Sequence, residues 1–264
     1  DTPELATEKS KDLVRMAVAK VGLMEPLKEA ELTVNQAAMV IGGGIAGITS
    51  AKNLADQGYE VHLIEKDSKL GGQANNLYKT YLEEDIQEGL SELVATVETN
   101  ERIHLHLDTT LDDVEGFVGN FKSTLTANGK NETIDHGVAV IATGATGLKP
   151  KEYCYGEDPR ILTSLELDRK FIDKDASIKE ANAAVFIQCV GSRDNDRPYC
   201  SRVCCTHSID NALELKTLNP EMDVYILYRD IRTYGEREYK YQKAREAGVI
   251  FIGNGHRPCP GCPP

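Results

Sequence analysis

The sequence predicts an α/β fold with two lobes, each built around a βαβ unit of the dinucleotide-binding type. Residues 37–66 run from an apolar strand through the glycine loop VIGGGIAG and a helical pattern to a second apolar strand, VHLIE. Residues 183–230 follow a similar order, from the strand AAVFIQCV through the helix HSIDNALELKTL to the strand DVYILYRD. With 264 residues, 41% of them hydrophobic, the chain is long enough to bury a real core.

The order of these patterns divides the chain into four segments. An amphipathic stretch with Leu13, Ala17 and Val21 on one face predicts a lead-in helix that ends before Pro26. We expect a connector helix and linker at 1–36, a Rossmann-type domain at 37–150, a second Rossmann-like lobe at 151–252, and a disordered or foreign tail at 253–264.

Further elements are expected between the two βαβ units. Helical patterns cover residues 82–98 and 165–171. The short alternating strands IHLHL and FKSTLTA surround GFVGNF, which predicts a small β-meander. The run VAVIA then returns as a buried strand that ends in ATGATG.

Charge and composition narrow the classes of function. A net charge of -12, spread along the chain, argues against binding to nucleic acid or to an anionic membrane, because both surfaces would repel it. The longest apolar stretches are too short and too rich in glycine to span a bilayer, and no basic segment precedes a cleavable apolar one. We therefore expect a cytoplasmic protein. Because the chain opens at Asp1, we also expect a fragment of a longer one.

The glycine loop has the features of a cradle for a dinucleotide. Gly42, Gly44 and Gly47 supply the GxGxxG spacing, in which the chain turns tightly, approaches a pyrophosphate and lets the helix pack on the strand. Glu65 ends the next strand, where a carboxylate can accept hydrogen bonds from ribose hydroxyls. The candidate residues of this loop and strand end are Gly42, Gly43, Gly44, Ile45, Ala46, Gly47, Glu65 and Lys66.

Two shorter motifs favour FAD over NAD as the dinucleotide. The segment LGGQ, with Gly72 and Gln73, resembles the GG segment of flavoproteins that have two dinucleotide-binding domains. The strand end ATG, with Thr143 and Gly144, resembles their second strand-end motif. Each could be an ordinary turn, but their order and spacing together predict a two-lobed flavoprotein.

Four cysteines occupy the corresponding loop of the second unit. Cys189, Cys200, Cys204 and Cys205 have the spacing C-x10-C-x3-C-C, just before a helix. Seven cysteines, crowded into the second half of the chain, do not fit a secreted disulfide framework. Four thiolates at a helix start suit a 4Fe-4S cluster. On spacing alone, a zinc site and a set of buried or redox thiols remain alternatives.

Several of these segments together resemble the A-subunit family of heterodisulfide reductases. The resemblance rests on VIGGGIAGITSAKNLADQGYEVHLIEKDSKLGGQ, GFVGNF, VAVIATGA, QCVGSRD, YCSRVCC and LYRDIRTYGEREYKY, and it covers about residues 5–252. It implies a thioredoxin-reductase-like fold with two dinucleotide-binding domains, truncated at the C-terminus. It also implies bound FAD and a 4Fe-4S cluster on the four cysteines named above.

The resemblance also implies a function and partners. Members pass electrons to subunits that reduce a heterodisulfide, and in some the flavin bifurcates electrons. The expected partners are other heterodisulfide reductase-like subunits and electron donors of the ferredoxin or hydrogenase type, and a homodimer is left open. The enzyme class is an oxidoreductase subunit without a catalytic acid, base or nucleophile, because the cofactors carry the chemistry. A metal-stabilised scaffold without catalysis is the alternative.

Some features depart from the family or stay outside these motifs. The chain lacks ferredoxin-type cysteine runs, and Asp210 stands near His207 where many relatives have a lysine. Cys154 is expected to be a spectator, and the Cys259 and Cys262 pair is expected to lie in a disordered tail. His104 and His106 share one face of a strand, but without a third ligand they are expected to be structural.

Overall fold

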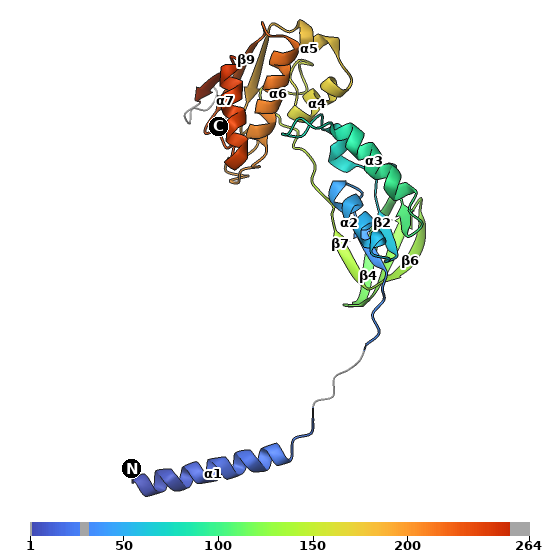
Figure 1. Cartoon of the computed structure of the whole chain (residues 1–264), viewed down its shortest axis with the longest axis vertical. Helices are drawn as coiled ribbons and strands as arrows, with labels where there is room; N and C mark the ends of the chain where they lie inside the picture. Colours follow the sequence, from blue (N-terminus) through green and yellow to red (C-terminus); the bar gives the residue numbers. More distant parts are fainter. Residues whose placement is uncertain (1, 27–31, 254–264) are drawn as a thin grey trace. The chain divides into compact units, whose positions relative to one another are not determined.

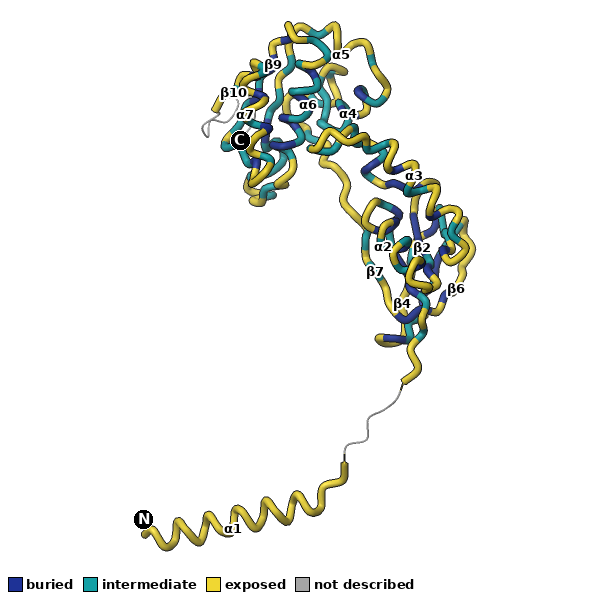
Figure 2. The backbone as a smooth tube through the Cα atoms, in the orientation of Figure 1, coloured by how far each residue is buried: buried dark blue, intermediate teal, exposed yellow. Residues whose placement is uncertain are grey.

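The computed structural model describes residues 2–26 and 32–253. The chain falls into two units, divided between Val34 and Asn35. The first contains the helix α1 (Pro3–Gly22), which starts with a proline and carries Lys20 in its last turn. The lead-in helix expected before Pro26 is thus present. None of its residues is buried, and Figure 2 shows it exposed along its length.

The first lobe of the second unit is built on a four-stranded parallel sheet with the order β3-β2-β1-β7. The strands are β1 (Ala38–Ile41), β2 (Val61–Ile64), β3 (Ile103–His106) and β7 (Val138–Ile141). Two helices, α2 (Ile45–Asp56) and α3 (Ile86–Glu98), pack against it, and the 3-10 helix η1 (Gly72–Asn76) follows β2. Val40, Ile48 and Leu63 are fully buried in the core between this sheet and its helices, whose arrangement Figure 1 shows. The apolar runs of β1 and β2 thus fold as the sequence predicts. The run of β7, which was expected to be a buried strand, is largely exposed, with Ile141 77% exposed.

A three-stranded antiparallel meander accompanies this sheet, with the order β4-β5-β6. Its strands are β4 (Thr109–Phe117), β5 (Asn120–Ala127) and β6 (Lys130–His136). Leu125 and Ile134 of the meander pack against Met39 and Ile64 of the parallel sheet.

The sequence analysis counted IHLHL among the strands of the meander, and this assignment is wrong. The run forms β3, which pairs in parallel with β2 and not with β4 or β5. Ile103 and Leu105 pack in the core formed with α2 and α3, which explains the choice of partner. A period of two shows that a strand is half buried, but it does not specify the neighbouring strand.

The second lobe contains a three-stranded parallel sheet with the order β10-β9-β8. Its elements are α4 (Ser164–Ile172), α5 (Ala176–Glu180), β8 (Ala183–Ile187), α6 (Cys204–Leu218), β9 (Asp223–Tyr228), the 3-10 helix η2 (Gly235–Arg237), α7 (Glu238–Glu246) and β10 (Ile250–Gly253). Thr163 and Glu166 form a capping box that starts α4. Ile209, Val224 and Ile226 are fully buried in the core of this lobe. None of the described helices is both long and apolar enough to cross a membrane.

Candidate functional site

The glycine loop between β1 and α2 requires glycine at two positions for its own folding. Gly42 has a φ of 106°, and a Cβ there would lie 2.3 Å from the carbonyl oxygen of Ala142. A Cβ on Gly47 would lie 1.8 Å from the carbonyl oxygen of Gly42. The first glycine therefore allows the turn, and the third allows the helix to pack closely on the strand.

Gly44 differs, because a Cβ there would meet no protein atom within 4 Å. Its φ of -79° and ψ of -178° are open to any residue, and it caps α2 without a side-chain hydrogen bond. The following residues, Ile45 and Ala46, are exposed. The loop thus has an open side at a helix N-terminus, where backbone N–H groups favour an anion. This geometry fits a dinucleotide pyrophosphate.

Glu65 at the end of β2 is buried and faces the glycine loop. One carboxylate oxygen accepts a hydrogen bond from the backbone N–H of Gly43 at 2.6 Å, and the other accepts from the N–H of Asp67 at 2.9 Å. The next residue, Lys66, is exposed. Since a carboxylate has about four acceptor positions, these two hydrogen bonds leave about two of them unused.

The two shorter flavin motifs converge on this loop. The N–H of Gly71 donates to the carbonyl oxygen of Gly43 at 2.7 Å, and a Cβ on Gly72 would lie 3.1 Å from the Cα of Gly44. Gln73 donates from Nε2 to the carbonyl oxygen of Ala145 at 3.1 Å.

The strand end ATG reaches the same place. A Cβ on Gly42 would lie 3.1 Å from the Cα of Thr143, and Gly144 is exposed with a φ of 66°. Three segments that are far apart in the sequence therefore meet around one loop.

The four cysteines follow β8 and lead into α6. Cys205 is buried, whereas Cys189, Cys200 and Cys204 are half buried, and all four are free thiols. Within residues 2–26 and 32–253, no group of three or more histidine, cysteine, aspartate or glutamate side chains is arranged to hold a metal ion. Four cysteine sulfurs are the donors that an iron-sulfur cluster uses. In this structure, however, the four sulfurs are not arranged around one point where a metal ion could bind.

The thiols nevertheless influence one another. A hydrogen bond with Cys205 lowers the pKa of Cys204, and the same bond together with burial raises the pKa of Cys205. Burial, assisted by the nearby Cys204, raises the pKa of Cys189. Three of the four sulfurs thus lie within electrostatic range of each other.

An ion-pair group lies beside these thiols. Asp230 pairs with Arg193 through one carboxylate oxygen and with Arg232 through the other, the latter at 2.7 Å. Arg193 Nη1 lies 4.0 Å from the Cys189 sulfur, and the carbonyl oxygen of Asp230 lies 4.0 Å from the Cys205 sulfur. The cysteine segment therefore has a cationic border in a chain whose net charge is -12.

A buried carboxylate that the sequence did not single out, Asp168, joins the segment after η1 to the cysteine helix. It accepts hydrogen bonds from the backbone N–H of Tyr78 at 3.1 Å and from Asn211 Nδ2 at 2.9 Å. His207 Nε2 lies 2.9 Å from the same carboxylate. These partners lie 90, 43 and 39 residues from Asp168 in the sequence, so no local sequence motif predicts that they meet at this carboxylate.

Asp210, noted as a departure from the family, pairs with a buried lysine. Lys240 of α7 is 2% exposed, and its Nζ lies 3.1 Å from Asp210 and 3.4 Å from Glu83. Burial raises the pKa of Asp210, although Lys240 opposes that rise.

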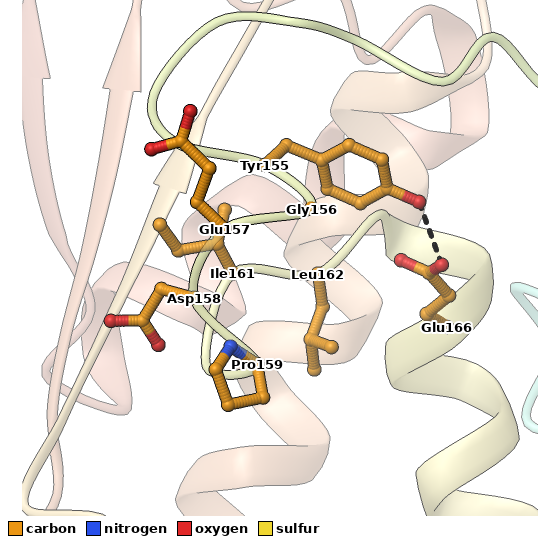
Figure 3. A pocket seen from close by; sticks show the side chains of 8 residues that line it. All are labelled: Tyr155, Gly156, Glu157, Asp158, Pro159, Ile161, Leu162 and Glu166. Atoms are coloured by element: carbon orange, nitrogen blue, oxygen red, sulfur yellow. Dashed lines mark hydrogen bonds between the residues drawn. The ribbon is translucent and has the colours of Figure 1, made fainter.

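The remaining candidates lie apart from these motifs. A hollow of about 310 Å³ is lined by Tyr155 and the following loop, with Tyr155 donating to Glu166 at 2.8 Å (Figure 3). Its carboxylates, which include Glu157 and Asp158, would repel a dinucleotide phosphate, and none of the predicted cofactor residues lines it. Cys154 is exposed, and Cys259 and Cys262 lie outside the described residues.

Curated relatives confirm the resemblance predicted from the motifs. The chain is 30% identical to the A-subunit of the H(2):CoB-CoM heterodisulfide,ferredoxin reductase of Methanothermobacter thermautotrophicus, over 96% of this chain and 52% of the relative. It is 29% identical to an iron-sulfur A-subunit of the CoB--CoM heterodisulfide reductase of Methanopyrus kandleri, over 95% and 52%. The chain thus spans about half the length of these relatives.

Solved structures confirm the predicted fold class. Thioredoxin reductase of T. acidophilum has a TM-score of 0.54 and 14% identity, covering 83% of this chain and 64% of the other. The NAD-dependent persulfide reductase of A. fulgidus has a TM-score of 0.52 and 22% identity, covering 82% and 39%. The fold is therefore α/β and thioredoxin-reductase-like.

Residues 36–193 match the family described as pyridine nucleotide-disulphide oxidoreductase, and this match supports FAD as the dinucleotide. Because the match covers more than half of the chain, the family is established. The chain therefore belongs to the pyridine nucleotide-disulphide oxidoreductases, and the curated relatives it matches are A-subunits of heterodisulfide reductases.

Proposed function

We propose that this chain is the electron-transfer core of a heterodisulfide reductase-like A-subunit, with FAD on the glycine loop and a 4Fe-4S cluster on Cys189, Cys200, Cys204 and Cys205. The main support for FAD binding is the open space at Gly44, at the start of α2 and next to the closely packed glycines Gly42 and Gly47. When bound, FAD and the cluster supply the electron-carrying chemistry.

The residues of the chain then have binding and orienting roles. The backbone N–H groups of Ile45 and Ala46 belong to the first turn of α2, which has no intrahelical acceptors for them, and they would bind a pyrophosphate there. Glu65 fixes the loop through Gly43 and retains acceptor positions for a ribose. Gly72, Gln73, Thr143 and Gly144 border the same space, and Lys66 is exposed at its edge.

Two observations support the proposed 4Fe-4S cluster: the chemistry of the four cysteine ligands and the name of a curated relative. Four free thiols on one loop and helix start are the ligands that a 4Fe-4S cluster uses, and the name of one relative describes it as an iron-sulfur protein. Arg193 and Arg232, held by Asp230, would offset the negative charge of four thiolates. Because reduced thiols persist in reducing compartments, the proposed location of the protein is the cytoplasm.

The partners are proposed from the names of the relatives. Several of these names include ferredoxin, and all describe heterodisulfide reductase subunits. Other subunits of that kind, with ferredoxin or hydrogenase-type donors, are therefore the proposed partners. Electron bifurcation is proposed only for an assembly with them.

The test is the cofactor content of anaerobically purified protein. We expect one flavin, with four iron and four sulfide per chain. Cys204→Ser and Cys205→Ser should lose or degrade the iron centre while flavin remains, because each removes one ligand. Cys154→Ser is the matched control and should leave iron unchanged, since Cys154 lies outside the C-x10-C-x3-C-C segment.

Two results would overturn the proposal. A colourless protein that contains zinc but no flavin would favour the metal-stabilised scaffold. Iron content that depends on Cys154 but not on Cys204 and Cys205 would show that the ligand set is wrong.

A further inference from the structure

Four of the five histidines in the described residues gather between the parallel sheet and the meander. His62 pairs in register with His104 across β2 and β3, and His106 follows two residues later on the same face. Their neighbours Val61, Leu63, Ile103 and Leu105 belong to the core on the opposite face. His136 of β6 lies on the histidine side and influences the pKa of His62. His62 is thus a third histidine on the face that His104 and His106 share, and the sequence analysis did not single it out.

Two of these rings direct nitrogens at each other. His62 Nδ1 lies 3.1 Å from His106 Nε2. Two imidazole ligands of one zinc ion, each about 2.0 to 2.1 Å from the metal, are separated by about 2.9 to 3.4 Å for bond angles between 90° and 109°. The observed separation falls within this range, so a cation between the two nitrogens would require little movement.

The surroundings suit metal ligation. Burial is the first cause that lowers the pKa of both His62 and His106, which favours the neutral rings that metal binding requires. In the metal-free protein one of the two facing nitrogens donates its N–H to the other, and a change of tautomer frees that nitrogen for a metal. His106 Nδ1, on the other side of the ring, lies 3.7 Å from Glu132 Oε2. A carboxylate at that nitrogen is the usual partner of a metal-bound histidine.

The other two histidines are committed elsewhere. His136 has Ser123 Oγ at 2.8 Å from one nitrogen and the carbonyl oxygen of Val138 at 3.1 Å from the other. His104 Nε2 lies 3.0 Å from Glu60, and its side chain is half exposed. The arrangement therefore offers two protein nitrogens, which agrees with the lack of any three-residue metal group among the described residues.

We propose that His62 Nδ1 and His106 Nε2 bind a late first-row divalent cation of the zinc class, with water completing the coordination and Glu132 orienting His106. The nitrogen donors favour such a cation over magnesium or calcium. The exposed side chains of Glu132 and His104 leave this end of the interface accessible to solvent. The two proposed ligands are residues of β2 and β3 and belong neither to the glycine loop nor to the cysteine segment.

The experiment is equilibrium dialysis of anaerobic protein against zinc, followed by zinc X-ray absorption. We expect bound zinc with a nitrogen and oxygen shell at about 2.0 to 2.1 Å, which is distinct from thiolate sulfur at about 2.3 Å. This readout on the unmodified protein separates the histidine site from the cysteines without any variant.

Variants then identify the ligands. His62→Gln and His106→Gln should each weaken zinc binding by more than about tenfold, and Glu132→Gln by about tenfold. His104→Gln is the matched control on the same face and should bind as the wild type does. A sulfur-only shell, or unchanged binding in both His62→Gln and His106→Gln, would overturn the proposal.

Discussion

Glu65 and Gly43 are joined by a hydrogen bond of 2.6 Å between the carboxylate and the backbone N–H. The second carboxylate oxygen accepts the N–H of Asp67 at 2.9 Å. The acidic residue at the end of β2 thus ties the glycine loop to the following turn. Sequence reasoning assigned it to the ribose alone, whereas the structure adds a role in folding the loop.

We expect Glu65→Ala to destabilise the flavin-free protein. The substitution leaves two backbone N–H groups without their acceptor, at about 1 to 3 kcal/mol each, so the free energy of unfolding should fall by about 2 to 6 kcal/mol. Glu65→Gln keeps one carbonyl acceptor and should lose less. Urea unfolding of the flavin-free variants measures both. Equal stability of Glu65→Ala and the wild type would restrict Glu65 to a ligand role.

The glycine loop offers a matched pair of substitutions. Gly44→Ala should fold normally, because its Cβ meets no protein atom, but it should bind FAD much more weakly, because the methyl group enters the space next to the loop. Gly47→Ala should destabilise the flavin-free protein by about 1 to 3 kcal/mol or more, because its Cβ would overlap the carbonyl oxygen of Gly42.

Thermal melts of flavin-free protein and a fluorescence titration with FAD separate the two effects. Normal flavin affinity in Gly44→Ala would mean that no phosphate approaches the loop at that residue.

Local patterns predicted most of the fold. The GxGxxG spacing, the strand ends and the helix periodicities depend on neighbouring residues, so α2, α3, α4 and α6 formed where the sequence placed them. The partner of Ile103 and Leu105 was not predictable in this way, because alternation is the same in a parallel sheet and in a meander.

Long-range contacts in the candidate site were also not predictable from local patterns. The candidate glycines and cysteines were predicted from their spacing. The contact of Arg193 with Cys189 and the convergence of Tyr78, His207 and Asn211 on Asp168 instead depend on long-range packing. A single sequence carries no signal that joins residues so far apart.

Asp168→Ala should be among the more destabilising substitutions in the second lobe. The carboxylate is 2% exposed, and its removal leaves Tyr78 N–H and Asn211 Nδ2 without their acceptor. We expect a loss of about 3 kcal/mol or more, with faster hydrogen exchange in the first turns of α6. Asp173→Ala, which removes only an exposed pair with Arg169 at 3.1 Å, is the control and should cost less than about 1 kcal/mol. Similar losses in the two variants would contradict this role.

The histidine group should make the metal-free protein sensitive to mild acid. Burial, then the nearby His106 and His104, lower the pKa of His62 from 6.5 to about 4, while Glu132 opposes the shift and His136 adds to it. The unfolded chain therefore takes up a proton near pH 6.5 that the folded protein resists until about pH 4.

Stability is thus fully present above pH 6.5 and falls as the pH drops toward about 4. Urea unfolding with a chelator present, at steps between these pH values, measures the slope. His62→Gln cannot take up the proton, so its stability should change less over the same range, although His106, whose pKa is also lowered, keeps part of the slope. The same pH slope in His62→Gln and the wild type would show that the acid sensitivity arises elsewhere.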